Sequence, residues 1–141
     1  MRTKFIGAFA GAVLFAAGAT QAATMTFTTG LVGSDEVPAN ATTGTGQVKA
    51  SLDTDTKALS YTITYSGLTG PATMAHFHGP AAPGANAPPV IVMKTLASPI
   101  TGSATLTDTQ IADLKAGKWY FNVHTAAHPG GEIRGQLKAA P

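Results

Sequence analysis

Cysteine is absent from the 141-residue sequence, and this absence limits how the fold can be held together. A chain without cysteine has no disulfide bonds and no thiolate metal ligands. Its fold must therefore be stabilised by packing, by hydrogen bonds and by any metal ion that nitrogen and oxygen ligands hold.

Charged residues are also scarce, at 11% of the sequence, and their signs are close to balanced. Two of the nine basic residues precede residue 23, whereas all seven acidic residues follow it, so residues 23–141 hold seven of each sign. The clusters of Lys and Arg that would bind a nucleic acid are missing. We therefore expect neither a nucleic acid nor another polyanion as a partner.

The apolar stretch near the start of the chain has the pattern of a secretion signal. Two basic residues precede it, residues 5–19 are apolar or small, and residues 20–22 offer small side chains at a cleavage site. The stretch contains three glycines and is shorter than the roughly 20 strongly apolar residues of a membrane-spanning helix. No cysteine follows it for lipid attachment. We expect residues 1–22 to be a cleaved signal peptide, and residues 23–141 to act in the periplasm or as a secreted protein without a membrane anchor.

Alternation of apolar and polar residues with a period of two dominates residues 23–141 and is typical of strands with one buried face. Turn-like residues at 53–56 predict an antiparallel hairpin, and a loop rich in proline and glycine interrupts the pattern at 79–89. Pro129-Gly130-Gly131 predicts a turn that pairs the last two strands. We expect strands at residues 25–31, 48–53, 59–65, 73–77, 90–94, 103–106, 119–125 and 132–138.

One short helix is predicted within this series of strands. Thr107 to Gln110 match a capping box, Ile111 and Leu114 form an apolar stripe, and Gly117 ends the helix. The chain after residue 22 suffices for one domain with a single core. We therefore predict an all-β domain, a Greek-key or immunoglobulin-like sandwich or barrel of about eight short strands with one short helix.

All four histidines fall in two short segments, His76 and His78 in the first and His124 and His128 in the second. Residues two apart in a strand share a face, so the imidazoles of His76 and His78 should project together while Phe77 points into the core. The same alternation turns His124 toward the polar face of its strand. These positions predict that imidazoles from two separate segments meet outside the core.

Imidazole nitrogen is a good ligand for copper and for zinc, so the histidines form a candidate metal site. His76, His78 and His124 would supply three nitrogens, with water as a fourth ligand and His128 assisting. The alternative is that His76 and His78 are ordinary strand residues bonded to backbone carbonyl groups. Because every histidine lies in one of two segments, we favour metal binding, with copper as the expected metal and zinc as the alternative.

Arg134 has two interpretations of its own. A cation a short distance from a metal attracts a small anion. More often such an arginine pairs with a nearby carboxylate, here Glu132 or Glu36, and orders the loops around it. The residues alone favour the second interpretation slightly.

Several stretches of the sequence resemble the CHRD family, whose domain is repeated in the developmental protein chordin and occurs singly in many exported bacterial proteins. They are LVGSDEVP at residues 31–38, AHFHGP at 75–80, YFNVHT at 120–125 and PGGEIRGQL at 129–137. The resemblance covers nearly all of residues 23–141, which we assign to one CHRD domain, and it implies a compact β-sandwich. Position 128 is often asparagine in that family, which makes His128 the weakest ligand candidate.

A second resemblance, to copper superoxide dismutases, concerns the order of the candidate ligands. Those enzymes are Greek-key barrels that hold copper with a His-x-His strand and a later Val-His strand, near an arginine that guides superoxide. His76 and His78, then Val123-His124, then Arg134 follow the same order here. A bridging histidine, a zinc loop and a cysteine pair are missing, which counts against dismutation more than against copper binding.

Three functions follow from these patterns, and the first is favoured. It is an exported domain that binds copper through His76, His78 and His124 and stores, delivers or scavenges the metal. The second is a dismutase-like enzyme in which Arg134 has a catalytic role and steers superoxide. The third is a structural or interaction module without a metal.

Overall fold

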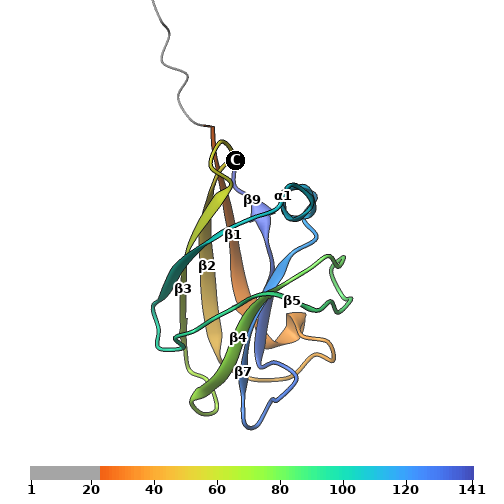
Figure 1. Cartoon of the computed structure of the whole chain (residues 1–141). Helices are drawn as coiled ribbons and strands as arrows, with labels where there is room; N and C mark the ends of the chain where they lie inside the picture. Colours follow the sequence, from red (N-terminus) through yellow and green to blue (C-terminus); the bar gives the residue numbers. More distant parts are fainter. Residues whose placement is uncertain (1–22) are drawn as a thin grey trace, which may run out of the picture.

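The computed structural model describes residues 23–141, and the predicted signal peptide at residues 1–22 lies outside the described part (Figure 1). Antiparallel strands form almost all of the regular structure, together with one α-helix and one short 3-10 helix. The elements are β1 (Thr24–Val32), η1 (Gly33–Asp35), β2 (Thr45–Asp53), β3 (Ala58–Ser66), β4 (Ala72–His78), β5 (Pro89–Val92), β6 (Ile100–Thr105), α1 (Asp108–Lys115), β7 (Tyr120–Thr125), β8 (Ile133–Gln136) and β9 (Lys138–Ala139).

The strands form one sheet in the order β5-β4-β7-β8-β1-β2-β3-β6, with β9 added beside β1. The sheet curls into a nearly closed barrel, which Figure 1 shows from the side. Strands that are distant in the sequence, such as β4 and β7, are therefore direct neighbours. The predicted all-β barrel or sandwich with one short helix is confirmed.

The core fills the inside of the barrel, as the period-two alternation predicts. Inward side chains on every long strand are buried, among them Phe27, Leu52, Ile63 and Phe121. Phe77 lies at the centre, with its ring centroid 4.8 Å from that of Phe121. Burying each large apolar side chain contributes about 1.5–3 kcal/mol, so this alternation fixes which face of each strand points outward.

The short helix begins and ends close to where the sequence predicts. The Thr107 hydroxyl accepts a hydrogen bond from the Gln110 backbone N–H, and the Gln110 side chain accepts one from the Thr107 N–H, which completes the capping box. Lys57 forms an ion pair with Asp108 in the first turn, at 2.8 Å. No helix within residues 23–141 is long and apolar enough to cross a membrane.

The strand predicted at residues 132–138 is divided in two. β8 pairs with β7 as expected, but the pairing ends at Gln136, and β9 pairs with β1 instead. The Leu137 N–H still donates a hydrogen bond, at 2.9 Å, to the carbonyl oxygen of Trp119, the residue directly before β7. β8 already meets β1 at Arg134, opposite Val32, and the chain continues along β1 as β9.

Two loops fold over the outer face of β4, β7 and β8. The loop at residues 79–89 is held by Arg134 and Gln136, whose side chains donate to Asn86 Oδ1 and to the Ala81 carbonyl oxygen, both at 2.9 Å. The second loop, residues 33–44 between β1 and β2, is attached to the residue before β8: the Asn40 side chain donates a hydrogen bond to the Glu132 carbonyl oxygen, at 3.0 Å. These loops turn part of the outer face into a covered layer.

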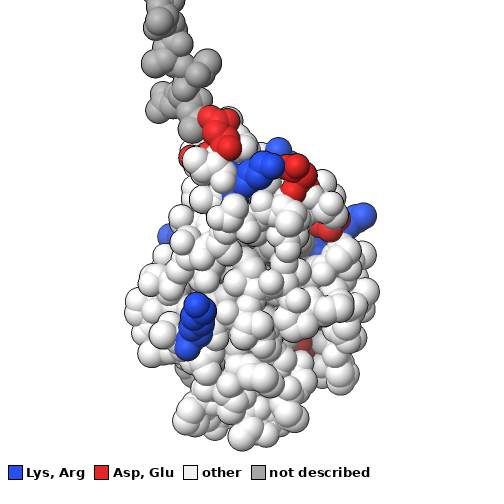
Figure 2. Space-filling model, viewed as in Figure 1, with Lys and Arg blue, Asp and Glu red and all other residues white. Residues whose placement is uncertain are grey.

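Charged side chains are unevenly distributed over the surface. Figure 2 shows them gathered, on the face in view, near the end of the barrel at which residue 23 begins, and sparse over the rest. This distribution fits the balanced charge of residues 23–141.

Candidate metal site

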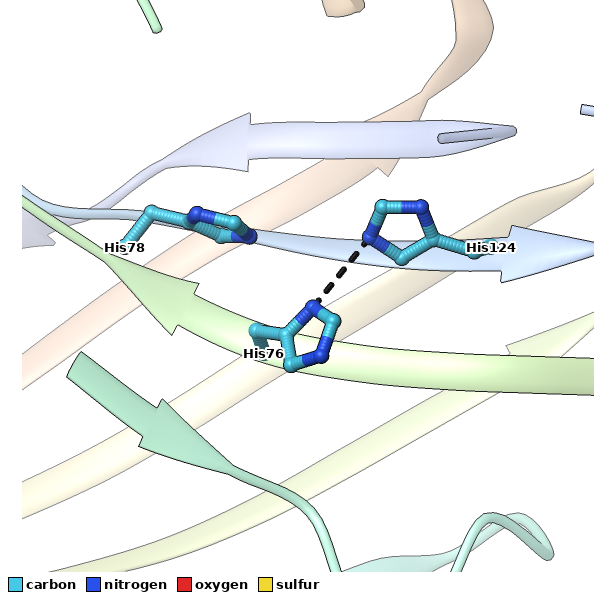
Figure 3. A group of neighbouring side chains, drawn as sticks. All are labelled: His76, His78 and His124. Atoms are coloured by element: carbon cyan, nitrogen blue, oxygen red, sulfur yellow. Dashed lines mark hydrogen bonds between the residues drawn. The ribbon is translucent and has the colours of Figure 1, made fainter. Parts of the chain in front are cut away.

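The imidazoles of His76, His78 and His124 meet on the outer face of β4 and β7 (Figure 3). One ring nitrogen of each residue lies within 4.8 Å of the corresponding nitrogens of the other two. The closest approach is 3.2 Å, between His76 Nδ1 and His124 Nε2. Two nitrogens bound to one metal at about 2.1 Å lie at most about 4.2 Å apart, so the three rings are close enough to share an ion after a small inward movement.

Strand register explains why these side chains meet. Phe77 faces the core, so His76 and His78 share the outward face of β4. Across the pairing, His76 lies opposite Asn122, and the next outward residue of β7 is His124. His124 is thus a diagonal neighbour of His76, within reach of a long side chain.

The three histidines are buried, although they face outward from the barrel. Their exposed fractions are 8% for His76 and 7% each for His78 and His124. Sequence alternation predicts a polar outward face but not the loops that cover it. The predicted surface site is therefore a recessed one, enclosed by the loop at 79–89 and by the turn between β7 and β8.

Backbone carbonyl groups fix the orientation of two of the rings. His78 Nδ1 lies 2.8 Å from the Ala87 carbonyl oxygen, and His124 Nδ1 lies 2.9 Å from the Pro129 carbonyl oxygen. A carbonyl oxygen only accepts, so Nδ1 carries the proton in each ring and Nε2 keeps its lone pair. Among the described residues, His76 has no such carbonyl partner, so its ring is the least constrained of the three.

Asn122 adds an oxygen to this set of lone pairs. Its Oδ1 lies 2.9 Å from His78 Nε2 and 3.0 Å from His124 Nε2. In neutral rings with protonated Nδ1 atoms these three atoms are all acceptors, and the one ring nitrogen that can offer any of them a proton is His76 Nδ1, 3.2 Å from His124 Nε2. A cation among them would satisfy all three, so the donor set fits a bound metal.

The Glu36 carboxyl lies near the Asn122 side chain and near Arg134, behind the imidazole cluster. Burial raises the pKa of Glu36 to about 7, against the opposing effects of the Arg134 charge and of the bonds from Asn122 and Val37. Glu36 Oε1 has no hydrogen-bond partner among the described residues.

The surroundings of His76 and His78 favour the uncharged form of both imidazoles. Burial lowers the pKa of His76 to about 4, helped by repulsion from His124 and His78. Burial also lowers the pKa of His78, and the neighbouring acceptor oxygens of Ala87 and Asn122 oppose this effect. Neutral imidazole is the form that binds metals, so His76 and His78 are in the form that a metal ion requires at neutral pH.

Arg134 is engaged with the covering loop. Its guanidinium carbon lies 3.5 Å from the centre of the Tyr120 ring, which is itself stacked on His78 at a centroid distance of 4.6 Å. Its two terminal nitrogens donate to Asn86 Oδ1 and to the Ala85 carbonyl oxygen. Only 2% of Arg134 is exposed, so its observed role is to order the loop and support the ligand stack.

Glu132, one expected partner of Arg134, is bound elsewhere. The hydroxyls of Thr42, Thr125 and Thr69 donate to its carboxylate at 2.6, 2.6 and 2.7 Å, and the Thr69 N–H donates at 2.9 Å. Burial raises the pKa of Glu132, but these bonds outweigh it and bring the pKa down to about 2. The carboxylate therefore ties together the loops at one end of the barrel.

His128 lies in the turn between β7 and β8, where its backbone bonds to that of Thr125, and it is not part of the imidazole cluster. The structure thus brings together three of the four histidines singled out from the sequence. Asn122 was not among them, although alternation places it on the same outward face as His124, two residues away. A polar residue in that row was the signal that could have identified it.

Comparison with known proteins gives one match. No curated protein and no solved structure matches the chain. The model of the CHRD domain matches residues 27–137, which span the sheet from β1 to the end of β8 and include every residue of the imidazole cluster. The chain therefore belongs to the CHRD domain family.

Proposed function

We propose that this CHRD domain binds a copper ion through His76, His78 and His124. The observation that carries the proposal is the group of acceptor atoms at the cluster: two Nε2 lone pairs, each within 3.0 Å of the Asn122 amide oxygen, on rings whose Nδ1 atoms are fixed by backbone carbonyls. Neutral acceptors held this close repel one another unless a cation lies among them.

The spacing of the donors supports copper over zinc. Ligand atoms bound at about 2.0–2.1 Å lie about 2.9 Å apart when they subtend a right angle at the metal, and about 3.4 Å apart at a tetrahedral angle. The two contacts with Asn122 Oδ1, at 2.9 and 3.0 Å, match the right-angle spacing, the His76–His124 contact of 3.2 Å falls between the two values, and the three ring nitrogens as a set lie within 4.8 Å of one another. Right angles are typical of Cu(II), whereas zinc prefers the tetrahedron.

Binding is proposed here in preference to catalysis. A dismutase-like enzyme would need Arg134 to meet an incoming anion, but the guanidinium is buried, stacked and bonded to the covering loop. A recessed site with fixed ligands suits storage, delivery or scavenging of the metal. The secretion-signal pattern of residues 1–22 supports a role in the periplasm or outside the cell.

Thermal unfolding with added metal tests the proposal. A ligand that binds only the folded state at 100 times its Kd adds about 2.7 kcal/mol, which corresponds to a rise in Tm of roughly 10 °C for a domain of this size. We expect such a rise with Cu(II), a smaller one with Zn(II), and a clearly reduced one with Cu(II) for His78→Ala or His124→Ala, which each keep two of the three imidazoles. His128→Ala is the matched control and should keep the full rise. Equal Tm values with and without Cu(II) in the unaltered protein would contradict the proposal.

A further inference from the structure

Met74 lies beside the imidazole cluster. It precedes His76 by two residues on β4, so it shares the outward face with His76 and His78, and its direct partner across the pairing is His124. Its exposed fraction is 46%, which is unusual for a large apolar side chain. Met74 therefore lies next to two of the proposed ligands, at the more open end of the outward row.

The other methionines cannot serve the same site. Met93 is buried in the core and Met25 packs against the core from β1, while Met1 lies outside the described residues. Because the chain has no cysteine, methionine is its only source of a sulfur ligand. Met74 is thus the one described sulfur that shares a strand face with the histidines.

The reach and the chemistry of Met74 suit a metal ligand. Residues directly opposite in an antiparallel pair have Cβ atoms about 4.5–5.5 Å apart, and methionine has three rotatable bonds beyond Cα. On the other side of β4, Val92 of β5 lies opposite His76 and is 61% exposed. This side of the cluster therefore has room for the Met74 thioether to move. Thioether sulfur is a soft ligand that favours Cu(I), whereas imidazole and amide oxygen also bind Cu(II).

We infer that Met74 is a further ligand of the site, one that binds when the copper is Cu(I). The inference rests on the proposed copper binding at the three histidines and adds an oxidation state to it. Cu(II) is held by the nitrogens and by Asn122 Oδ1, and Cu(I) is held by the nitrogens and the Met74 sulfur. The site then retains copper in either state, which suits a protein that takes up or delivers the ion outside the cytoplasm.

Met74→Leu tests this assignment, because leucine keeps the apolar bulk and removes the sulfur. Cu(I) affinity is measured without oxygen, by competition with a coloured Cu(I) chelator, and Cu(II) affinity is measured separately in air. We expect Met74→Leu to weaken Cu(I) binding by tenfold or more and to leave Cu(II) binding within about twofold. Met25→Leu, which removes a thioether from the same chain away from the site, should change neither.

X-ray absorption at the copper edge gives a second, independent readout. The Cu(I)-loaded protein should show one sulfur neighbour that Met74→Leu lacks and Met25→Leu retains. Unchanged Cu(I) affinity with no sulfur neighbour would overturn the assignment of Met74, as would an equal loss of Cu(I) and Cu(II) binding. If the unaltered protein binds neither ion, the proposed function itself is wrong, so the two failures are distinguishable.

Discussion

Asn122 is the residue whose side chain links His78 on β4 to His124 on β7. Its oxygen lies 2.9 Å from His78 Nε2 and 3.0 Å from His124 Nε2. Asn122 therefore contacts two of the three proposed ligands at once.

Replacing Asn122 tests this role. Asn122→Leu keeps the size of the side chain and removes the oxygen, so we expect Cu(II) affinity to fall by about 10- to 100-fold. Titration followed by the visible absorption of bound Cu(II) measures the change. Gln47→Leu removes an exposed amide from β2 and serves as the control. Affinity equal to that of the unaltered protein would show that the oxygen contributes nothing.

At the scale of the elements, the loop at residues 79–89 forms the cover of the site. Arg134 on β8 holds it through Asn86 and Ala85, and the Ala87 carbonyl in the same loop orients His78. The loop thus determines both the burial of the cluster and the tautomer of one ligand. Its attachment to β8 links the loop to the sheet beneath the site.

Arg134→Lys should loosen this loop. Lysine keeps the charge but cannot donate from two nitrogens in a planar fork or stack on Tyr120 in the same way. We expect a loss of about 2 kcal/mol in the free energy of unfolding and faster amide hydrogen exchange at residues 81–88 than in the unaltered protein. Lys49→Arg, at an exposed position on β2, is the control. Unaltered exchange in the loop would contradict this role for Arg134.

The Glu132 carboxylate joins a second set of elements. It accepts hydrogen bonds from the loops that precede β2 and β4 and from the end of β7. Its folded-state pKa of about 2 is below the ordinary value of 4.5, so its contribution is present above pH 4.5 and is lost as the pH falls toward 2. The shift corresponds to at most about 3 kcal/mol.

Glu132→Gln should remove this dependence on pH. We expect the variant to be less stable than the unaltered protein at pH 7 by about 2–3 kcal/mol, with the difference shrinking as the pH falls toward 2. Urea unfolding at a series of pH values measures it. A constant difference across that range would show that the charge on Glu132 does not stabilise the fold.

At the scale of the whole molecule, the sequence predicts the faces of the strands well and the space around the site poorly. Alternation correctly placed Phe77 inward and His76 and His78 outward, and the capping box correctly placed α1. These features are local, because each depends on residues a few positions apart. The family resemblance to the CHRD domain is likewise confirmed.

Long-range features could not be predicted in the same way. The register that sets Met74 opposite His124 joins strands separated by β5, β6 and α1, and no local pattern specifies it. The cover over the cluster depends on Arg134 meeting Asn86 and Ala85 across 48 and 49 residues. For these reasons the depth of the site and the role of Asn122 became visible only in the folded chain.

Electron paramagnetic resonance of the Cu(II)-loaded protein tests the central claim most directly, because coupling to nitrogen identifies the ligands of the bound ion. We predict coupling to three imidazole nitrogens, one each from His76, His78 and His124, and the loss of one of them in each single alanine variant. A spectrum without imidazole coupling, or one that the three variants leave unchanged, would contradict the metal site.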